Sequence, residues 1–577
     1  MVGNAFMSES SSSKVSSDEA SRRRAVPEGR DQQAFPKLTD AQVNRIRPYA
    51  KEEHLDADTI VFRRGQRNAD FYVVLEGCIE IFDFNCQGEP QPFTEHCENQ
   101  FTGEIDLFSD RKVLVSGRTT KPSRVLKVSN DGFRDLLAAE PEVGDIMVRA
   151  FIVRRLGILE QNLGGSLLVG RHNDSETLTI RQFLRRNGYP AQTIYLGDEG
   201  GEAKALMERH DATENDLPMF LCHGEDVLKR PDRMDVAKTT GLVERPRSDC
   251  TYDLTIIGAG PGGMAAAVYG ASEGLDTVVL ERDAPGGQAG TSSKIENYLG
   301  FPTGLSGQEL AGRAQIQAQK FGATLALPME VHAIDGERPP YRLRLSCDTQ
   351  IETRTIVIAS GARYRKLNLD NEAQFEGLGL YYAATALEAG LCENQEVCVV
   401  GGGNSAGQAA VYLSTVAKKV HILVRGDSLA SSMSDYLIRR IDASDDIELH
   451  THTEITALYG EDALESIDWT HNDSGQTERK DISKVFLMIG AKPNSDFVDG
   501  WVDTDDNGFI CTGIDIVDAS NWPLGRSPRP FETSRPGVFA IGDVRSGSVK
   551  RVASAVGEGS VCVQFVHQVV SELVQQG

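Results

Sequence analysis

One stretch, residues 252–283, constrains the fold of this 577-residue chain more than any other part of the sequence. An apolar run there breaks into Gly258, Gly260 and Gly263 at GxGxxG spacing, and an alanine-rich stretch follows. A second apolar run then ends in Glu281. This order predicts a strand, a tight turn, a helix and a second strand.

The chemistry expected at this stretch is the binding of a dinucleotide. The first glycine allows the tight turn, the second lets the backbone approach a pyrophosphate, and the third permits close packing of helix on strand. The pyrophosphate would sit on the N–H groups of the helix N-terminus, and Glu281 is placed to accept hydrogen bonds from a ribose. A glycine-rich turn in some other α/β protein is the alternative, and the helix and terminal acid in register weigh against it.

Length and charge narrow the classes of function. At roughly 100–200 residues per domain, the 577 residues predict about three to five domains. The formal net charge of −24 and a pI near 5.0 argue against a general affinity for nucleic acid or anionic lipid, while basic partners stay open. No apolar run approaches the roughly 20 residues of a membrane helix, and the N-terminus lacks the apolar core of a secretory signal. We therefore expect a cytoplasmic protein with no nucleic-acid or membrane partner.

Cysteine spacing excludes further classes of site. The ten cysteines contain no Cys-x-x-Cys pair, which argues against a zinc ribbon and against a vicinal dithiol. We expect no disulfide framework, and buried, reduced thiols instead. The cysteines are Cys78, Cys86, Cys97, Cys222, Cys250, Cys347, Cys392, Cys398, Cys511 and Cys562.

Composition and motif order predict a multidomain chain. Residues 1–35 contain few apolar side chains, so they cannot bury enough surface to offset their ordering entropy and are expected to be disordered. The remaining predicted segments are a β-barrel or jelly roll with helices at 36–160, an α/β domain at 165–240, a linker at 241–251, and two α/β Rossmann-like domains, one formed by 252–366 with 492–577 and the other by 367–491.

Short alternating runs separated by turns predict the small β-barrel, with helices from Asn130 to about Glu160. Together with the motif Gly103-Glu-Ile, this pattern resembles a cyclic-nucleotide-binding domain. The other residues that carry the resemblance are Gly65, Asp70, Tyr72 and Gly77. The resemblance implies that Glu104 binds the ribose 2′-hydroxyl of a cyclic nucleotide.

The position that should bind the cyclic phosphate departs from that family's pattern. Its arginine falls at Val113 in register, and only Arg111 or Arg118 could substitute from nearby. A buried phosphate that lacks its guanidinium partner loses about 3–5 kcal/mol, or about two to four decades in affinity. We therefore expect a degenerate domain, or one with an altered ligand, rather than a sensor of cAMP.

Residues 165–240 carry a βαβα pattern that ends in Leu-Pro before an apolar strand. This pattern resembles a thioredoxin or glutaredoxin fold, in which that proline, here Pro218, is cis. The positions of that family's two thiols fall at about Asp174 and Thr177. Dithiol exchange requires thiolates, so we expect a docking or structural role for this segment.

Five motifs in a fixed order carry a further resemblance over residues 252–575. They are the opening fingerprint, Gly286-Gly-Gln with Ile295-Glu-Asn, Ile356-Val-Ile-Ala-Ser-Gly-Ala, Val399-Val-Gly-Gly-Gly-Asn-Ser-Ala and Gly537-Val-Phe-Ala-Ile-Gly-Asp. Together they closely resemble the low-molecular-weight thioredoxin reductases, which are flavoproteins with two dinucleotide-binding domains. The resemblance implies a homodimer, with an NAD(P)H-binding domain inserted into the FAD-binding domain. It implies FAD contacts from Gly258, Gly260, Gly263, Glu281, Gln288, Asn297, Gly542 and Asp543.

A second fingerprint, Gly401-x-Gly403-x-x-Ala406, follows an apolar run and indicates the nicotinamide nucleotide site. The next predicted strand ends in Arg425 instead of an acid. An acid there would repel a 2′-phosphate, whereas arginine can pair with it, so NADPH is expected ahead of NADH. The resembling family carries a second arginine where this chain has Gly426, which leaves the preference open. The candidates for the missing contact are Arg439 and Arg440.

The segment where that family carries its redox dithiol reads Ala383-Ala-Thr-Ala386-Leu387. Both sulfurs and the acid of a Cys-Ala-Thr-Cys-Asp centre are thus replaced. Cys392 and Cys398 are not vicinal, and Cys398 lies in the predicted strand that enters the second fingerprint. Because alanine cannot form a disulfide or enter thiol exchange, no catalytic side chain is assigned.

These observations predict an FAD-dependent NAD(P)H oxidoreductase that lacks a redox dithiol. Hydride would pass from NADPH to FAD, and electrons would pass on to an unknown small-molecule or protein acceptor, while the protein supplies binding and orientation. Alternatives stay open: disulfide reduction through an unrecognised thiol, electron delivery to a ferredoxin or quinone, and a non-catalytic sensor of redox state or nucleotide. No metal site is predicted.

Overall fold

The computed structural model describes residues 31–84, 90–103, 107, 111–160, 166–172, 174–198, 201–222, 226–292, 295, 298–382, 384, 386–430, 432–461, 463–516 and 522–576. The chain divides into two compact units, residues 1–171 with 179–244 and residues 172–178 with 245–577. Across the described ranges, no helix is both long and apolar enough to cross a membrane.

The expectation of disorder over residues 1–35 is wrong for its last residues. Asp31–Ala34 form helix α2, because Ala34 is buried against Val153 and Phe35 packs on the same cluster. The preceding residues of the predicted tail lie outside the described ranges.

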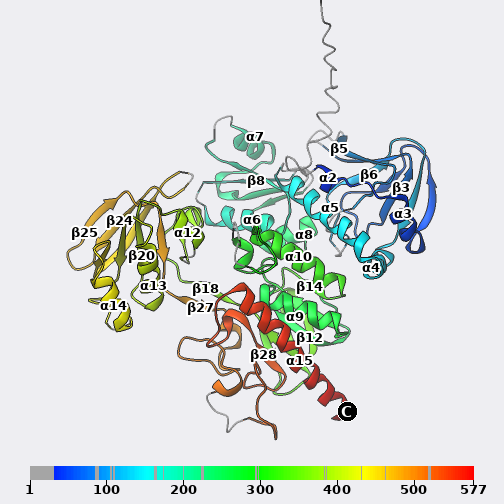
Figure 1. Ribbon diagram of the computed structural model, residues 1–577. Helices are drawn as coiled ribbons and strands as arrows, with labels where there is room; N and C mark the ends of the chain where they lie inside the picture. The colour runs from blue at the N-terminus through cyan, green and yellow to red at the C-terminus, as the bar shows by residue number, and fades with distance from the viewer. Residues whose placement is uncertain are drawn as a thin grey trace, which may run out of the picture. The chain divides into compact units, whose positions relative to one another are not determined.

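Two antiparallel sheets form the N-terminal part of the first unit, drawn in blue in Figure 1. The strands are β1 (Lys51–Leu55), β2 (Ile60–Phe62), β3 (Phe71–Glu76), β4 (Cys78–Phe84), β5 (Pro90–Cys97), β6 (Ser116–Thr119) and β7 (Ser123–Val128). They pair in the orders β1-β7-β3 and β2-β6-β4-β5. Helix α3 (Asp40–Ile46) precedes them, and α4 (Asn130–Ala139) and α5 (Pro141–Glu160) follow. The rings of Phe71 and Phe133 pack at 4.8 Å between centroids and join β3 to α4. The helices predicted from Asn130 to about Glu160 are present, as are strands at three of the four predicted runs; the fourth run, residues 103–108, lies mostly outside the described residues.

Cys78 and Cys97 form a disulfide that joins β4 to β5. These residues lie directly opposite each other in the antiparallel register, with their Cα atoms 4.2 Å apart. The expectation of reduced thiols throughout was wrong for this pair, because sequence spacing does not reveal which residues face each other across two strands. The described free cysteines are Cys222, Cys250, Cys392, Cys398, Cys511 and Cys562.

A small mixed sheet follows, with the order β11-β10-β8-β9. Its elements are β8 (Leu167–Gly170), α6 (Ser175–Arg186), β9 (Gln192–Tyr195), α7 (Glu202–Arg209), β10 (Met219–Cys222), β11 (Asp226–Lys229) and α8 (Arg233–Thr240). β8 and β9 are parallel, whereas β10 is antiparallel to β8. The peptide bond before Pro218 is cis, as the resemblance implied. The predicted elements are present, and their assignment to a thioredoxin fold stays a prediction.

A largely parallel sheet forms the core of the second unit. Its path runs β14-β13-β12-β17-β16-β15, and β28 pairs with β17. The strands are β12 (Thr251–Ile257), β13 (Thr277–Leu280), β14 (Thr324–Ala326), β15 (Val331–Asp335), β16 (Tyr341–Leu345), β17 (Gln350–Ile358) and β28 (Val538–Ala540). Helices α9 (Pro261–Ser272), α10 (Gly307–Lys320) and α15 (Val552–Gln576) pack on one face (Figure 1). Apolar clusters bury both faces, which explains the continuous apolar runs of β12, β13 and β28.

A second parallel sheet has the order β19-β26-β20-β21-β22. Its strands are β19 (Leu380–Tyr381), β20 (Glu396–Val400), β21 (Lys419–Leu423), β22 (Ile447–His450) and β26 (Val485–Leu487). Helices α13 (Asn404–Leu413) and α14 (Asp435–Asp442) pack on one face. The antiparallel strands β23 (Thr453–Tyr459), β24 (Ser466–His471) and β25 (Gln476–Lys480) form a sheet that packs on the other. Helices α11 (Glu372–Phe375) and α12 (Ala386–Gly390) flank β19 in the sequence. This is the second Rossmann-type layer that the sequence predicts.

The chain leaves the first parallel sheet for the second through β18 (Ala362–Tyr364) and returns through β27 (Ala491–Pro493). These strands pair antiparallel with each other. The predicted boundaries at residues 367 and 491 lie beside this pair.

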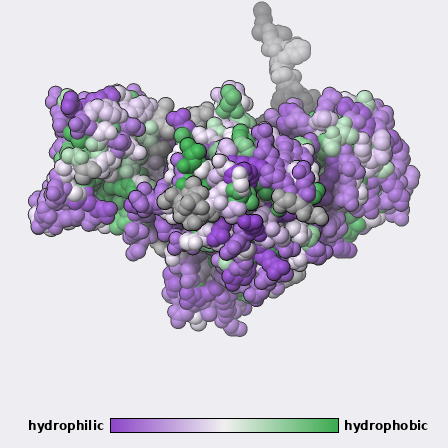
Figure 2. Space-filling model, turned by 90° about the horizontal axis from the view of Figure 1, so that it is seen from below, coloured by the Kyte–Doolittle hydropathy of each residue, from purple (hydrophilic) through white to green (hydrophobic). Residues whose placement is uncertain are grey.

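The surface drawn in Figure 2 is mostly hydrophilic, with hydrophobic residues in scattered small groups. Isolated exposed apolar side chains such as Leu299, Ile514 and Val574 are normal for a globular chain and mark no interface by themselves.

Candidate functional site

The first candidate site lies at the carboxyl edge of the sheet that contains β12. β12, β13, β17 and β28 run parallel, so the residues that follow each strand gather at one edge. Gly258 follows β12, Glu281 follows β13 and Asp543 comes shortly after β28. Open parallel sheets bind ligands at this edge. The structure thus brings together predicted FAD residues that lie far apart in the sequence.

Each glycine of the first fingerprint meets a different steric demand. Gly258 has a φ of +106°, and a Cβ there would collide with the carbonyl oxygen of Ala359. A Cβ on Gly263 would collide with the carbonyl oxygen of Gly258, so glycine lets α9 pack closely on the turn. Gly260 differs, because a Cβ on it meets no atom within 4 Å. The open space beside Gly260 lies at the N-terminus of α9 and fits the approach of a pyrophosphate.

Glu281 is held in one orientation by backbone N–H groups. Its Oε2 accepts a hydrogen bond from Ala259 at 2.8 Å, and its Oε1 accepts from Asp283 at 2.8 Å and from Ala284 at 3.2 Å. Only 9% of the residue is exposed. The carboxylate therefore ties the end of β13 to the first glycine turn, at the place predicted to bind the ribose.

A second glycine turn lies against the first. The N–H of Gly286 donates to the backbone of the first turn at 2.8 Å, and a Cβ on Gly287 would approach the Cα of Gly260 to 3.0 Å. The predicted FAD residue Gln288 follows this turn and is exposed. Asn297, another predicted FAD residue, lies outside the described residues. The structure therefore places Gln288 directly after the second of these two glycine turns, and the role of Asn297 stays a prediction.

Asp543 lies in a short turn, Gly542–Val544, just after β28. The N–H of Gly542 donates to Oε2 of Glu558 on α15 at 2.6 Å, which fixes the turn. Burial raises the pKa of the Asp543 carboxyl group, and Glu558 adds to the rise while Lys550 opposes it. A polar group in such surroundings needs a hydrogen-bond partner, which the hydroxyl groups of a cofactor can provide.

Sequence reasoning missed an aromatic pair near Asp543. Tyr364 on β18 and Tyr382 after β19 stack with their ring centroids 5.1 Å apart and 12° between the planes. Burial and the charge of Asp543 raise the pKa of Tyr364. Tyr382 donates a hydrogen bond to Glu376 at 2.8 Å and directly precedes Ala383. No motif marks these tyrosines, because their stacking depends on the pairing of strands that are distant in sequence.

The second candidate site repeats the arrangement at the carboxyl edge of the other parallel sheet. Gly401 follows β20 with a φ of +137°, and a Cβ there would collide with the carbonyl oxygen of Met488. Gly403 is the N-cap of α13, and a Cβ on it meets only the carbonyl oxygen of Ser432, at 3.9 Å. Ala406 is fully buried. The opening at Gly403 leaves room for a phosphate at the helix N-terminus.

Arg425 comes shortly after β21, at this same edge. Its side chain is exposed and makes no hydrogen bond or ion pair with the described residues. The alternative cations Arg439 and Arg440 lie exposed on α14, which packs beside α13. A free guanidinium at the end of this strand fits a 2′-phosphate.

The segment that replaces the dithiol is described only in part. Ala383 lies outside the described residues, and Ala386 begins α12, with its side chain undescribed. Cys392 donates from its Sγ to the carbonyl oxygen of Glu388 at 3.1 Å, and burial raises the pKa of this thiol to about 11. Cys398 is fully buried in β20, and burial raises its pKa well above the usual range. These two thiols lie on different parts of the fold, Cys392 just after α12 and Cys398 within β20.

The thiol positions of the predicted thioredoxin-like segment form a helix cap. Asp174 precedes α6, and its Oδ2 accepts hydrogen bonds from the N–H of Thr177 at 2.8 Å and from its hydroxyl at 2.6 Å. This arrangement satisfies an N–H group that the first turn of a helix leaves without a partner. The two side chains therefore stabilise the helix end and offer no thiol chemistry.

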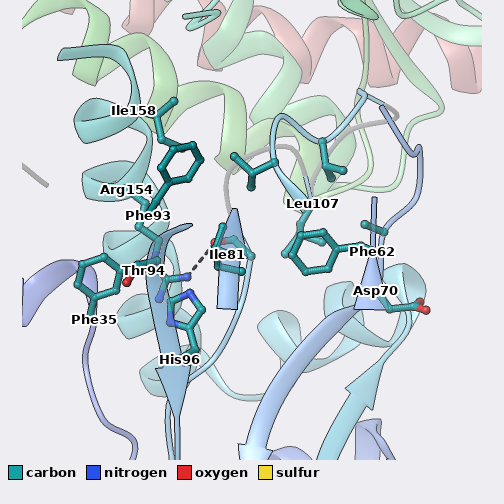
Figure 3. Close-up of a pocket in the computed structure, with 14 residues that line it drawn as sticks. Phe35, Phe62, Asp70, Ile81, Phe93, Thr94, His96, Leu107, Arg154 and Ile158 are labelled. Atoms are coloured by element: carbon teal, nitrogen blue, oxygen red, sulfur yellow. Dashed lines mark hydrogen bonds between the residues drawn. The ribbon is translucent and has the colours of Figure 1, made fainter. Parts of the chain in front are cut away.

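A pocket in the first unit is lined by strands and by α5 (Figure 3). Val113, at the position of the phosphate-binding arginine, forms part of its wall. The ring nitrogen Nδ1 of the buried His96 has no hydrogen-bond partner among the described residues. The lining is mostly apolar and consists of Phe35, Phe62, Ala69, Asp70, Ile81, Phe93, Thr94, His96, Gly103, Leu107, Val113, Val115, Arg154 and Ile158.

Neither substitute arginine lines this pocket. Arg111 is buried and donates from Nε to Glu244 at 2.9 Å, while Arg118 pairs with Glu80 at 2.7 Å. Arg154 does line it, and it donates hydrogen bonds to the backbone carbonyls of Ala34, Gly103 and Phe101. Sequence reasoning missed Arg154 because it lies in a mostly apolar helix with no binding motif. Glu104, the predicted ribose contact, lies outside the described residues.

Comparison with known proteins gives consistent assignments. Residues 252–559 match the pyridine nucleotide-disulphide oxidoreductase family, and residues 52–140 match the cyclic nucleotide-binding domain. The thioredoxin reductase of Bacillus subtilis is 32% identical over 323 residues, which cover 56% of this chain and 96% of that protein. The thioredoxin reductase of Vibrio cholerae is 33% identical over 310 residues, which cover 53% of this chain and 92% of that protein. A solved thioredoxin reductase structure from Streptococcus pyogenes is 32% identical, with a TM-score of 0.49, and covers 56% of this chain and 100% of that one.

The family match begins at the first fingerprint and continues past Asp543. It therefore includes both parallel sheets and the glycine turn at the carboxyl edge of each, which we call the two glycine edges. The separate match to residues 52–140 falls on the two antiparallel sheets of strands β1 to β7 and on helix α4. The chain therefore belongs to the pyridine nucleotide-disulphide oxidoreductase family, as a relative of the thioredoxin reductases that also carries an N-terminal cyclic nucleotide-binding domain.

Proposed function

We propose that this protein is an FAD-dependent NAD(P)H oxidoreductase that passes electrons to an acceptor other than a dithiol of its own chain. The observation that carries the proposal is the pair of glycine edges, each with open space beside its second glycine, together with alanine at positions 383 and 386. Bound FAD would supply the redox chemistry, accepting a hydride from NADPH and giving up two electrons to the acceptor.

The residues at the first edge have complementary roles in this proposal. The N-terminus of α9 beside Gly260 holds the pyrophosphate through backbone N–H groups. Glu281 binds the ribose hydroxyls, and because backbone N–H groups already orient it, little side-chain freedom is lost on binding. Asp543, partly buried at the end of β28, accepts a hydrogen bond from another hydroxyl of the cofactor. Tyr364, which stacks on Tyr382, lies close enough to Asp543 for its charge to raise the pKa of the Tyr364 hydroxyl group.

At the second edge, the N-terminus of α13 beside Gly403 holds the pyrophosphate of the nicotinamide nucleotide. Arg425 pairs with the 2′-phosphate, which favours NADPH over NADH. NADH remains a donor with lower affinity.

The purified protein should be yellow, with about one FAD per chain. Gly260→Val should fold but lose FAD, because its side chain fills the open space and its φ of −69° suits any residue. Gly263→Val is the matched control and should lower the thermal stability itself, because its Cβ collides with the turn. Absorbance near the flavin bands after desalting measures FAD, and thermal unfolding measures stability. A colourless protein that FAD cannot reconstitute, or tight FAD binding by Gly260→Val, contradicts the proposal.

NADPH should reduce the flavin faster than NADH at equal concentration, and Arg425→Ala should narrow this difference. Loss of one charged hydrogen bond to phosphate costs about 1.5–3 kcal/mol, or roughly ten- to a hundredfold in affinity. Arg479→Ala, an exposed arginine on β25 of the same part, serves as the control and should leave the preference unchanged. Stopped-flow absorbance of the flavin gives the rates. A faster reaction with NADH in the unmutated protein would falsify the role of Arg425.

NADPH should reduce the flavin without any reduction of thioredoxin or of an aromatic disulfide. The paired replacement Cys78→Ser with Cys97→Ser should leave the flavin reduction rate unchanged, as should serine at every other cysteine in a variant shown to fold. The hypothesis is lost if the unmutated protein turns over thioredoxin with NADPH, or if one cysteine replacement abolishes acceptor reduction while FAD stays bound. A screen of ferredoxin, quinones and oxygen identifies the acceptor, whereas a sensor would be reduced once and then turn over with none of them.

We also propose that the pocket of the first unit does not bind cAMP tightly. Val113 cannot neutralise a cyclic phosphate, and the arginines on either side of it are already engaged with Glu80 and Glu244. The missing guanidinium should weaken cAMP by about two to four decades relative to a domain that has it. Titration calorimetry with cAMP should therefore give no heat at micromolar concentrations. Micromolar or tighter binding would show that another cation, such as Arg154, serves the phosphate.

A further inference from the structure

Two histidines and a glutamate meet on adjacent strands of the second parallel sheet. His421 lies on β21, and Glu448 and His450 lie on β22. In the parallel register His421 is opposite Glu448, and His450 lies two residues further along β22, so all three side chains share one face. Nδ1 of His421 is 3.0 Å from Nε2 of His450. Oε1 of Glu448 lies 3.6 Å from that nitrogen of His450, and the other oxygen, Oε2, lies 4.0 Å from Nδ1 of His421.

These separations match the geometry of a small divalent cation. Zn²⁺ binds imidazole nitrogen and carboxylate oxygen at about 2.0–2.2 Å, and a tetrahedral site at that bond length separates its donors by about 3.3 Å. The observed separations of 3.0, 3.6 and 4.0 Å lie on either side of that value. Small rotations of the side chains therefore bring all three donors to bonding distance of one ion.

The environment of His421 directs one nitrogen into the cluster. The residue is 7% exposed, and its Nε2 is buried without a well-formed hydrogen bond. That Nε2 lies 3.5 Å from Oε2 of Glu396 on β20, on the side away from His450. A carboxylate that accepts the N–H of one ring nitrogen fixes the tautomer and leaves the other nitrogen as a donor to metal. Glu396 thus lies beside Nε2 of His421, while Nδ1 faces His450 and Glu448.

Trp469 on β24 holds both imidazoles in place. Its ring centroid lies 5.3 Å from that of His421 and 4.8 Å from that of His450. Lys419 pairs with the carboxylate of Glu448 at 2.8 Å. The side chain of Glu448 is 47% exposed, which gives an ion a route of entry from solvent. A bound cation displaces Lys419, whose ammonium group can move into water.

We propose that His421, Glu448 and His450 form a binding site for one divalent transition-metal ion of the zinc type, with Glu396 as the partner of His421 and water as the fourth ligand. Two imidazoles and one carboxylate favour Zn²⁺, Ni²⁺ or Cu²⁺ over Mg²⁺ and Ca²⁺, which prefer oxygen donors. The ligands come from two strands and share no sequence motif, so no spacing in the sequence predicts the site. The three side chains lie on the face of the sheet that β24 covers, opposite α13, and the proposal does not depend on the proposed oxidoreductase activity.

The test is titration calorimetry of the full-length, FAD-loaded protein with Zn²⁺ after treatment with EDTA. We expect Zn²⁺ to bind with a 1:1 stoichiometry at this site and Mg²⁺ to give no heat. His421→Ala and His450→Ala should weaken Zn²⁺ binding by at least about a hundredfold, because even the partners of metal ligands are worth roughly ten- to a hundredfold. Glu448→Gln should weaken it too, and this variant keeps the size of an exposed side chain, so folding is not at risk. His332→Ala, an exposed histidine on β15, is the matched control and should bind Zn²⁺ normally.

Tryptophan fluorescence gives a second readout, independent of activity. Cu²⁺ at the site should quench Trp469, and Trp469→Phe should remove that quenching while Zn²⁺ still binds. The proposal is overturned if the unmutated protein does not bind Zn²⁺, or if the two histidine variants and Glu448→Gln bind Zn²⁺ and respond to Cu²⁺ as the unmutated protein does.

Discussion

The close approach of Gly258 to the backbone of Ala359 is the constraint on which the first nucleotide edge depends. The N–H of Gly258 donates to Leu280 at 2.8 Å, and the N–H of Ala359 donates to Ile257 at 2.8 Å, so the turn is tied to the strands on both sides. No side chain fits between them. The helix that follows must then begin at the edge of the sheet, with its N–H groups directed outward. The second sheet has the same close approach at Gly401, where a Cβ would collide with the backbone of Met488. In both sheets the steric requirement for glycine at one position fixes where the following helix begins.

In the first unit, two arginines near the pocket are paired with acidic side chains of the protein itself. The cations that the β-barrel could have offered to an anionic ligand are used in structural pairs, Arg111 with Glu244 and Arg118 with Glu80. Arg111 and Glu244 are both buried, and removing one partner of such a pair leaves an uncompensated charge, which costs about 3–5 kcal/mol. The two arginines are therefore held in structural ion pairs and are not available to pair with a ligand. The pocket wall is mostly apolar, and its one lining arginine among the described residues, Arg154, donates hydrogen bonds to three backbone carbonyls.

Features of this protein that follow from local rules could be predicted from its sequence, and features that follow from strand register could not. The glycine turns and the positions of Glu281 and Arg425 at the carboxyl edges depend on steric and topological rules that act over a few residues. Sequence motifs therefore predict them. The Cys78–Cys97 disulfide and the His421–His450 contact join residues on neighbouring strands. The spacing of these residues in the sequence does not predict either pair. The ion-pair partners of Arg111 and Arg118 could not be predicted either, because the sequence around an arginine does not indicate which acidic side chain lies next to it in the fold.

The first parallel sheet is assembled from segments that leave the ribosome far apart in time. β28 pairs with β17 through Ile356 and Val538, and the whole second sheet is synthesised between them. A nascent chain that has reached β27 already contains both glycine turns, but it lacks β28, Asp543 and the helix α15 that packs on α9. Pairing across such a sequence separation is slow, because loop closure precedes any gain from the contact. This carboxyl edge is therefore completed only when β28, Asp543 and α15 have been synthesised, long after every glycine of the fingerprint is present.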